Sequence, residues 1–191
     1  SIGKNRYKII LQKGLKWSDG KEVVANQYID AWKRLLDSRT ASTYAYLLYF
    51  VKGAKKYNQG LLPQERLGFR ATGPYTIELE LEPELASKRQ QKFSGAVFSH
   101  WATYPTRNDL IEKYGSSWAS KPSQMAFNGP YKVVVYRPSE KIELIPNASH
   151  RSPGKLDKIE ALVVPDDGAA LRLFESGRLH FMAEFSSLDR K

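Results

Sequence analysis

The stretch that decides how the chain folds is the turn Gly14-Leu15-Lys16-Trp17-Ser18-Asp19-Gly20. Serine and aspartate side chains can hydrogen-bond the backbone of a turn, and a glycine accepts a positive φ without a steric penalty. Residues 7–12 before it are rich in apolar residues and read as a strand that ends at Lys13-Gly14. After it, apolar residues recur at helical spacing, namely Tyr28, Trp32, Leu35 and Leu36. The stretch therefore predicts a structural turn between a strand and an amphipathic helix.

The next part of the chain predicts a second, largely buried helix at residues 44–50 and a short strand at residues 69–71. From residue 75 to 82, apolar residues alternate with Glu78, Glu80 and Glu82, as in a strand with one solvated face. Acid–base catalysis or metal binding by these glutamates would require a histidine or a second carboxylate cluster, and neither lies nearby in the sequence. A hydrated strand face is the prediction.

The middle of the chain predicts a short helix and then a hairpin. Residues 106–114 have one apolar side, and Thr106 or Asn108 is the expected helix cap. Residues 131–136 and 141–145 read as two strands joined by a turn at Pro138-Ser139-Glu140.

The last third of the chain predicts a β-α-β unit and hence an α/β fold. Residues 159–164 read as a strand, Asp166 or Asp167 caps a helix at residues 169–174, and Gly177 ends it in a left-handed conformation. Residues 179–182 are expected to return as a parallel strand through a right-handed crossover. A sheet of this kind needs more strands to cover its faces and edges, so the sequence is expected to be cut short.

The composition limits the possible functions. The 191 residues are 41% hydrophobic, contain no cysteine and carry a formal net charge of +10. This apolar content supports a packed core, and no apolar stretch approaches the roughly 20 residues of a membrane-spanning helix. The basic residues are scattered without a run of five like charges, which favours a solvated basic surface. A basic nucleic-acid or polyanion-binding module is the alternative from another functional class.

No catalytic or metal-binding motif is present. The glycines do not have the spacing of a phosphate loop or a dinucleotide-binding fingerprint, and no Gly-x-Ser-x-Gly elbow occurs. The histidines His100, His150 and His180 lie far apart in the sequence. No catalytic residue, metal site or cofactor is therefore predicted. Most of the aromatic residues are expected in the core, and the remainder are expected to line a cleft for a ligand.

The turn at residues 14–20 closely resembles the one found in the peptide- and nickel-binding family (family 5) of extracytoplasmic solute-binding proteins of ABC importers. The resemblance continues through the helix with Trp32-Lys33-Arg34-Leu35-Leu36-Asp37 and the signature Asn128-Gly129-Pro130-Tyr131. Thr40-Ala41-Ser42-Thr43-Tyr44-Ala45 resembles the oligopeptide-binding branch, and Leu173-Phe174-Glu175-Ser176-Gly177 completes the pattern near the C-terminus.

This resemblance implies part of a two-lobed periplasmic-binding-protein fold of class II, with mixed sheets and flanking helices. Residues 1–105 would be the extra α/β subdomain of lobe I, and residues 106–191 part of the main α/β lobe I, with lobe II absent. The implied protein is a monomer that binds oligopeptides and delivers them to ABC permease subunits. It would reside in the periplasm or on the cell surface as a lipoprotein, with no nucleic-acid partner. Other cargo in the same family would be a dipeptide, a nickel chelate, haem or a sugar.

Two groups of residues take roles from the resemblance. Tyr44 and His100 occupy positions near the ligand in the oligopeptide branch. The others are expected to be structural: Trp17, Ser18, Asp19, Gly20, Asn128, Gly129 and Tyr131. The chain departs from the family pattern at Arg178-Leu179-His180 and at residues 146–151, where basic residues replace acidic and aromatic ones. These replacements put ligand contacts at that edge in doubt and hint at acidic cargo.

Overall fold

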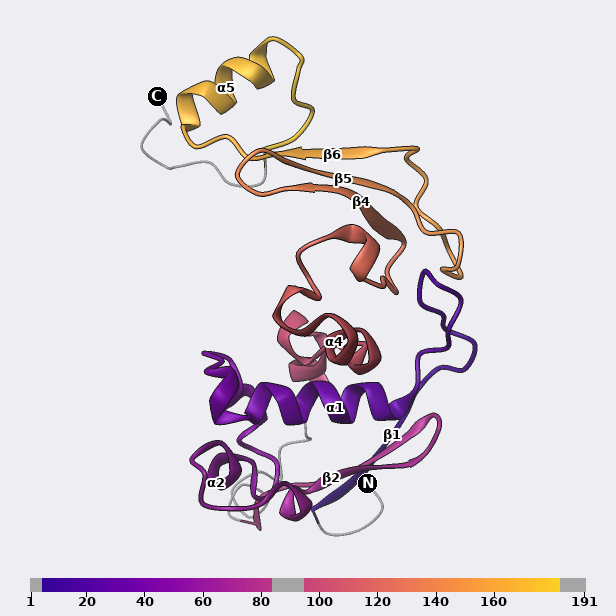
Figure 1. Cartoon of the computed structure of the whole chain (residues 1–191), viewed down its shortest axis with the longest axis vertical. Coiled ribbons are helices and arrows are strands. Elements are labelled where there is room, and N and C mark those ends of the chain that lie inside the picture. The colour runs from indigo at the N-terminus through magenta and orange to yellow at the C-terminus, as the bar shows by residue number, and fades with distance from the viewer. Residues whose placement is uncertain (1–4, 84–94, 183–191) are drawn as a thin grey trace.

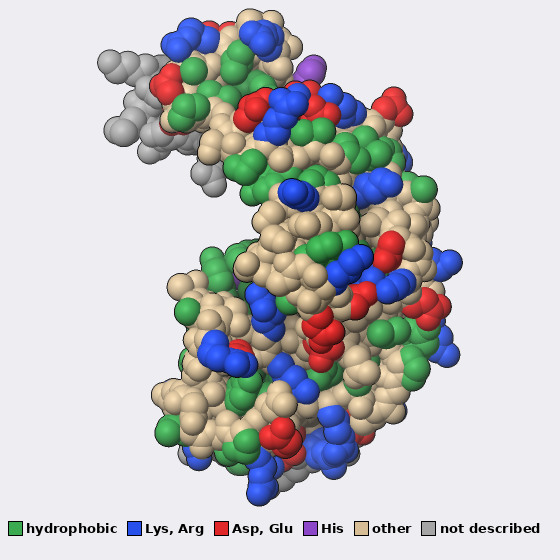
Figure 2. All heavy atoms as spheres, viewed as in Figure 1, with side chains coloured by type: hydrophobic (Ala, Val, Ile, Leu, Met, Phe, Trp, Pro, Cys, Tyr) green, Lys and Arg blue, Asp and Glu red, His purple; other side chains and the backbone are tan. Residues whose placement is uncertain are grey.

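Two three-stranded antiparallel sheets organise the part of the chain that the computed structural model describes, residues 5–83 and 95–182. The first sheet contains β1 (Arg6–Ile10), β2 (Phe69–Gly73) and β3 (Thr76–Glu80) in the order β1-β3-β2. The second contains β4 (Tyr131–Arg137), β5 (Lys141–Pro146) and β6 (Ile159–Leu162) in that order. The sheets lie at opposite ends of the molecule (Figure 1), and one flank between them is hollowed (Figure 2).

The alternation predicted for the strand of the first sheet is confirmed. Ile77 and Leu79 of β3 are buried, whereas Glu78 and Glu80 are only half-buried. Since β3 is the central strand, its buried residues pack beside partners on both sides, and Leu79 lies opposite both Tyr7 of β1 and Phe69 of β2. Side chains two apart on a strand share a face, so one face of this sheet forms the wall of the core.

Helix α1 (Ala25–Leu36) lies between this sheet and the segment that carries α4 (Figure 1). The helix was predicted from its apolar spacing, and its buried residues extend around more than one face because it is covered on both sides. These residues are Ala25, Ile29, Ala31, Trp32, Leu35 and Leu36. At its start, the side-chain oxygen of Gln27 accepts a 3.0 Å hydrogen bond from the backbone N–H of Val24, which satisfies one donor of the helix end.

The helix predicted at residues 44–50 is reduced to the single 3₁₀ turn η2 (Ala45–Leu48). Of residues 44–50, Ala45 and Leu48 are buried, Tyr46 is exposed and the others are half-buried, so the predicted burial is found only in part. The helix does not continue because the following backbone joins the edge of the first sheet. Val51 forms a bridge with Leu81, and the backbone of Phe50 accepts a hydrogen bond from the N–H of Glu82.

The short helix predicted at residues 106–114 is α4 (Asn108–Tyr114), but neither expected cap is used. Arg107 occupies the cap position, and Thr106 Oγ1 is buried without a hydrogen-bond partner in the described residues. Asn108 instead donates to Glu112 at 2.8 Å. The side chain of Arg107 makes no cap hydrogen bond and instead forms ion pairs with Asp19 and Asp109.

The hairpin of β4 and β5 is confirmed, and β6 extends it by antiparallel pairing with β5. Asp166 caps α5 (Asp167–Glu175) by accepting hydrogen bonds from Gly168 and Ala169, as predicted for one of the two aspartates. Gly177 has the expected left-handed φ of +73°.

The predicted β-α-β unit is wrong, because the described residues 179–182 form no strand and no parallel pair. The backbone N–H groups of Arg178 and Leu179 both donate to the carbonyl of Leu173 at the end of α5. These donors satisfy the helix terminus and are therefore not available to a strand ladder.

The remaining described elements are short turns of helix that connect the larger ones. They are η1 (Ser38–Thr40), α2 (Ala54–Asn58), η3 (Gln64–Arg66), η4 (Gly95–Ser99), η5 (Trp101–Thr103), η6 (Gly115–Ser117) and η7 (Pro122–Gln124). Among the described residues, no helix has the length and apolar content needed to cross a membrane. Lysine and arginine side chains are spread over the visible face and interspersed with acidic ones (Figure 2), in agreement with the scattered charge of the sequence.

Candidate functional site

The segment from η4 to η5 is anchored on α1 by buried contacts. The indole Nε1 of Trp32 donates a 2.9 Å hydrogen bond to the carbonyl of Thr103, and the Trp32 ring stacks on Phe98 with centroids 5.1 Å apart. Thr103 is 1% exposed, and its hydroxyl lies 3.1 Å from the carbonyl of Val97 and 2.8 Å from that of His100. Leaving buried polar groups unpaired costs about 1–3 kcal/mol each. The segment therefore has a well-defined conformation.

Three aromatic side chains meet at the start of η5. The Tyr44 ring centroid lies 5.2 Å from that of His100 and 4.8 Å from that of Trp101, in an edge-to-face arrangement with the tryptophan. His100 and Trp101 stack with centroids 5.3 Å apart. Both Tyr44 and His100 are half-buried, whereas Trp101 is 62% exposed. We call Tyr44, His100 and Trp101 the ring cluster.

The backbone fixes the proton position on His100 in its neutral form. The N–H of Ala102 donates to Nδ1 of the imidazole at 3.2 Å, so Nδ1 must present a lone pair. The neutral ring then carries its proton on Nε2. A half-buried Nε2–H is a donor suited to a carbonyl or carboxylate oxygen of a ligand.

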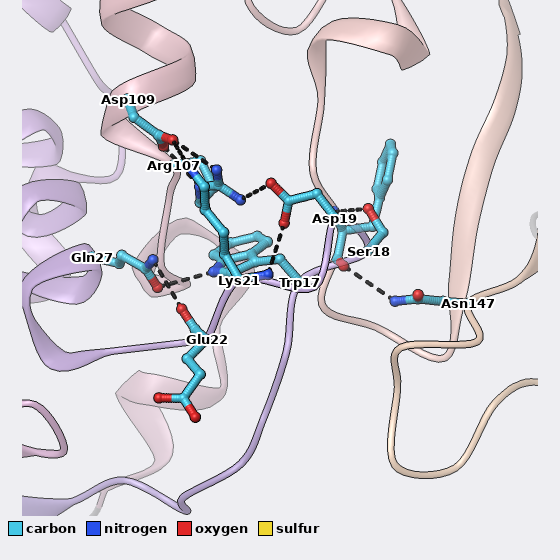
Figure 3. A network of polar contacts seen from close by, with 10 residues as sticks. Trp17, Ser18, Asp19, Lys21, Glu22, Gln27, Arg107, Asp109 and Asn147 are labelled. Carbon is cyan, nitrogen blue, oxygen red and sulfur yellow. Dashed lines mark hydrogen bonds and ion pairs between the residues drawn. The ribbon is translucent and has the colours of Figure 1, made fainter.

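The turn at Trp17–Gly20 connects residues that lie far apart in the sequence (Figure 3). The N–H of Ser18 donates to the carbonyl of Phe127 at 2.7 Å, and the Ser18 hydroxyl accepts from the N–H of Phe127 at 3.1 Å, 109 positions along the chain. Asn147, which is 1% exposed, donates through Nδ2 to the carbonyls of Phe127 and Gly129 at 3.2 and 2.9 Å. Gly20 has φ +85°, the conformation expected for the glycine of this turn.

Trp17 links the same turn to α1. Its indole is 4% exposed and donates to the side-chain oxygen of Gln27 at 3.0 Å. The same oxygen accepts from the N–H of Val24, and the Gln27 amide donates to the carbonyl of Glu22 at 3.2 Å. The turn, the start of α1 and the segment around Phe127 thus form one hydrogen-bonded unit.

Arg107 places a buried positive charge beside this unit (Figure 3). Its guanidinium, 2% exposed, pairs with Asp109 through two 2.7 Å hydrogen bonds and with Asp19 at 2.8 Å, and it lies 5.8 Å from the Trp17 ring centroid. Lys21 contacts the same Asp109 at 2.8 Å. Hydrogen bonding by Arg107 holds the pKa of the Asp109 carboxyl far below its usual range, and Asp109 in turn raises the pKa of Arg107.

Tyr131 secures the entry into β4. Its hydroxyl accepts a 3.0 Å hydrogen bond from the N–H of Leu156, and its ring lies against Gly154 so closely that a Cβ there would be 2.0 Å from a ring carbon. Asn128 and Gly129 lie in the loop directly before the strand. Gly129 contributes its carbonyl to Asn147. The backbone of this loop is therefore fixed by contacts from Tyr131 and Asn147.

The described residues contain no group of three histidine or acidic side chains placed to hold a metal ion. The three glutamates of the strand face have structural contacts. Glu78 pairs with Arg70 at 2.7 Å, Glu80 with Lys52 at 2.6 Å, and Glu82 accepts from the N–H of Gly53 at 2.8 Å. An open apolar hollow of about 460 Å³ lies beside α5, lined by Leu171, Phe174, His180, Phe181 and Met182.

The structure brings together Tyr44 and His100, the two residues that the sequence suggested for ligand contact. It places Trp17–Gly20 and residues 128–131 in a separate region, where the turn before α1 is hydrogen-bonded to the segment before β4. Sequence reasoning missed Arg107 and Asn147, because isolated polar residues in loops carry no periodic signal. It counted Trp101 among the aromatic residues expected to lie in the core or to line a cleft and did not single it out, although its position next to His100 was visible in the sequence.

The whole chain, residues 1–191, matches the family described as bacterial extracellular solute-binding proteins, family 5 Middle. The dipeptide-binding protein DppE of Bacillus subtilis is 28% identical over 91% of this chain and 31% of its own length. The OppA structure of Burkholderia pseudomallei is 29% identical with a TM-score of 0.84, and covers 93% of this chain and 34% of its own. Listeria monocytogenes OppA bound to peptide is 28% identical with a TM-score of 0.83, over 94% and 35%.

The chain thus spans about a third of the length of the relatives that it matches. Its fold, with mixed helices and antiparallel sheets, agrees with part of the two-lobed fold implied by the sequence motifs. On the match over its full length, the chain belongs to family 5 of the bacterial extracellular solute-binding proteins.

Proposed function

We propose that the protein containing this chain is the substrate-binding component of an ABC importer and that it binds peptides outside the cytoplasmic membrane. It would deliver them to the membrane permease without chemical change. Its relatives support a peptide cargo, because one is a dipeptide-binding protein and another is an OppA bound to peptide. We further propose that the protein acts as a monomer in the periplasm or as a lipoprotein on the cell surface.

The observation that carries the proposal within this chain is the ring cluster. Its three members offer ring surface together with a histidine donor, a combination that suits a peptide, which has side chains to pack and carbonyl oxygens to hydrogen-bond. We infer that Tyr44 and His100 contact the cargo. Trp17–Gly20 and Asn128, Gly129 and Tyr131 would hold the scaffold, in keeping with their mutual hydrogen bonds.

A role without catalysis agrees with the chemistry of the cluster. A nucleophile needs an adjacent base to activate it, and a general base must lie within hydrogen-bond reach of the proton that it removes. Among the described residues, the contacts of the His100 imidazole are the rings of Tyr44 and Trp101 and the backbone N–H of Ala102. Peptides recovered after long incubation with the protein should therefore be intact by mass spectrometry.

Isothermal titration of the full-length protein with defined dipeptides to pentapeptides tests the proposal. We expect saturable binding of at least one length class, weakened about tenfold or more by Tyr44→Leu, since buried aromatic anchors contribute most of the affinity of a site. Tyr46→Leu is the matched control, because Tyr46 is an exposed tyrosine two residues away. Absence of binding for every peptide length would refute the proposal.

A protein whose function is to bind nucleic acid would instead retard nucleic acid in a gel-shift assay. The net charge of +10 would then support a gel shift that weakens steeply with salt. We expect no shift at moderate salt, because the basic residues do not gather into one patch on the face shown in Figure 2.

A further inference from the structure

The exposed position of Trp101 is not explained by packing. A tryptophan is usually largely buried, because its ring offers more apolar area than almost any other side chain. Trp101 is 62% exposed, yet the turn that carries it is anchored by the buried Thr103 and by the indole of Trp32. The structure therefore holds a large apolar ring at the surface on a well-defined base.

The neighbours of Trp101 restrict how its ring can lie. It stacks on His100 at an interplanar angle of 29° and meets Tyr44 at 68°, so two sides of its environment are aromatic. A further ring placed here could adopt the offset or edge-to-face contacts that aromatic pairs prefer. An aliphatic side chain would gain binding free energy only from the burial of its apolar surface. A cationic side chain would gain about 0.5–1 kcal/mol at an exposed ring, and would be opposed by the net charge of +10.

We propose that Trp101 is a specificity-determining residue, which receives an aromatic side chain of the bound peptide against the ring cluster. This inference rests on the proposed peptide-binding function and adds to it the class of side chain that is preferred. The Nε2–H of His100 would lie beside that side chain and donate to a peptide carbonyl, which would fix the ring in place.

The test uses the full-length protein and matched tripeptides that contain phenylalanine, cyclohexylalanine or alanine at one position, scanned through all three positions. Cyclohexylalanine keeps the bulk of phenylalanine but lacks its aromatic ring. We expect one position at which phenylalanine binds about 3- to 10-fold more tightly than cyclohexylalanine, the range given by aromatic pair energies. Trp101→Leu should abolish this preference and Trp101→Phe should retain most of it.

The control is Phe174→Leu, since Phe174 is an exposed aromatic residue on α5 in the other part of the chain. This variant should leave the preference unchanged. A second measurement is quenching of tryptophan fluorescence by acrylamide, where the difference between wild type and Trp101→Phe reports Trp101. A bound phenylalanine-containing peptide should reduce the acrylamide quenching of the Trp101 fluorescence.

The outcomes separate the two proposals. If the wild type binds no peptide, the proposed function fails. If it binds peptides but Trp101→Leu weakens phenylalanine, cyclohexylalanine and alanine peptides equally, or if Trp101 stays fully quenchable in the complex, only the role of Trp101 is overturned. A dimer of the wild type that Trp101→Leu dissociates would also overturn it, because the ring would then face a second copy.

Discussion

Replacement of Arg107 by methionine should destabilise the folded protein by about 2–3 kcal/mol. The guanidinium is buried and makes three charge-assisted hydrogen bonds, two to Asp109 and one to Asp19. Removal of one partner of a buried ion pair costs about 3–5 kcal/mol when the remaining charge stays buried. Here the two carboxylates are 47% and 40% exposed and would regain water, which lowers the expected loss. Methionine has a side chain of similar length but lacks the charge that lies 5.8 Å from the Trp17 ring centroid.

Urea unfolding followed by circular dichroism measures this loss, with Arg70→Met as the matched control. Arg70 makes a 2.7 Å ion pair with Glu78, but its side chain is 66% exposed, so we expect a loss of about 0–1 kcal/mol. Because the folded pKa of Asp109 is lowered, its contribution is complete above the unfolded pKa near 4 and disappears as the pH falls through the lowered folded pKa. The difference between wild type and Arg107→Met should therefore narrow in acid. An effect of Arg107→Met no larger than that of the control would refute the reasoning.

Three further predictions concern β5 and the loop that follows it. Asn147→Asp should lower the free energy of unfolding by about 3–5 kcal/mol in thermal or urea unfolding, because it replaces a buried amide donor by a carboxylate facing two carbonyl oxygens. Asn147→Ala should lower it less, and the reverse order would contradict this account. Gly154→Ala should lower the melting temperature and displace Tyr131, whose ring occupies the place of the new methyl group. An unchanged melting temperature would contradict this expectation, because it would mean that the loop backbone moves to accept the methyl group at no cost in stability. Glu143→Gln should reduce stability at pH 7 but not in acid. Hydrogen bonding to Lys141 lowers the pKa of Glu143, so the stability that Glu143 contributes is lost as the pH falls through that lowered value. A loss of stability that is the same at both pH values would exclude the ion pair as its cause.

Elements with strong local signals could be predicted from the sequence. Three elements have such signals: α1 has apolar residues at helical spacing, β3 has apolar residues at every second position, and a turn motif joins β4 to β5. The structure contains all three elements. The parallel strand predicted at residues 179–182 was wrong. Its apolar pattern fits a strand, but the N–H groups of Arg178 and Leu179 donate to the carbonyl of Leu173 at the end of α5. Such competition for backbone hydrogen bonds depends on the tertiary arrangement and leaves no periodic trace in the sequence.

The candidate site could be predicted only in part, for a similar reason. The resemblance pointed to Tyr44 and His100 singly, whereas their contact depends on how Trp32 and Thr103 hold the intervening segment. The partner of Ser18 lies 109 positions away, and Asp19, one of the two partners of Arg107, lies 88 positions away, so no local pattern could reveal these contacts. Their role follows from long-range pairing, which a single sequence does not display.

Trp32 contacts two layers of the molecule at once. Its ring meets Phe69 of β2 at 5.5 Å on one side and Phe98 at 5.1 Å on the other, while its indole N–H supports Thr103. The first sheet and the surface that bears Trp101 should consequently move as a single rigid body. On the proposed function, a peptide would then meet rings that are already in position, so little entropy would be lost in ordering them.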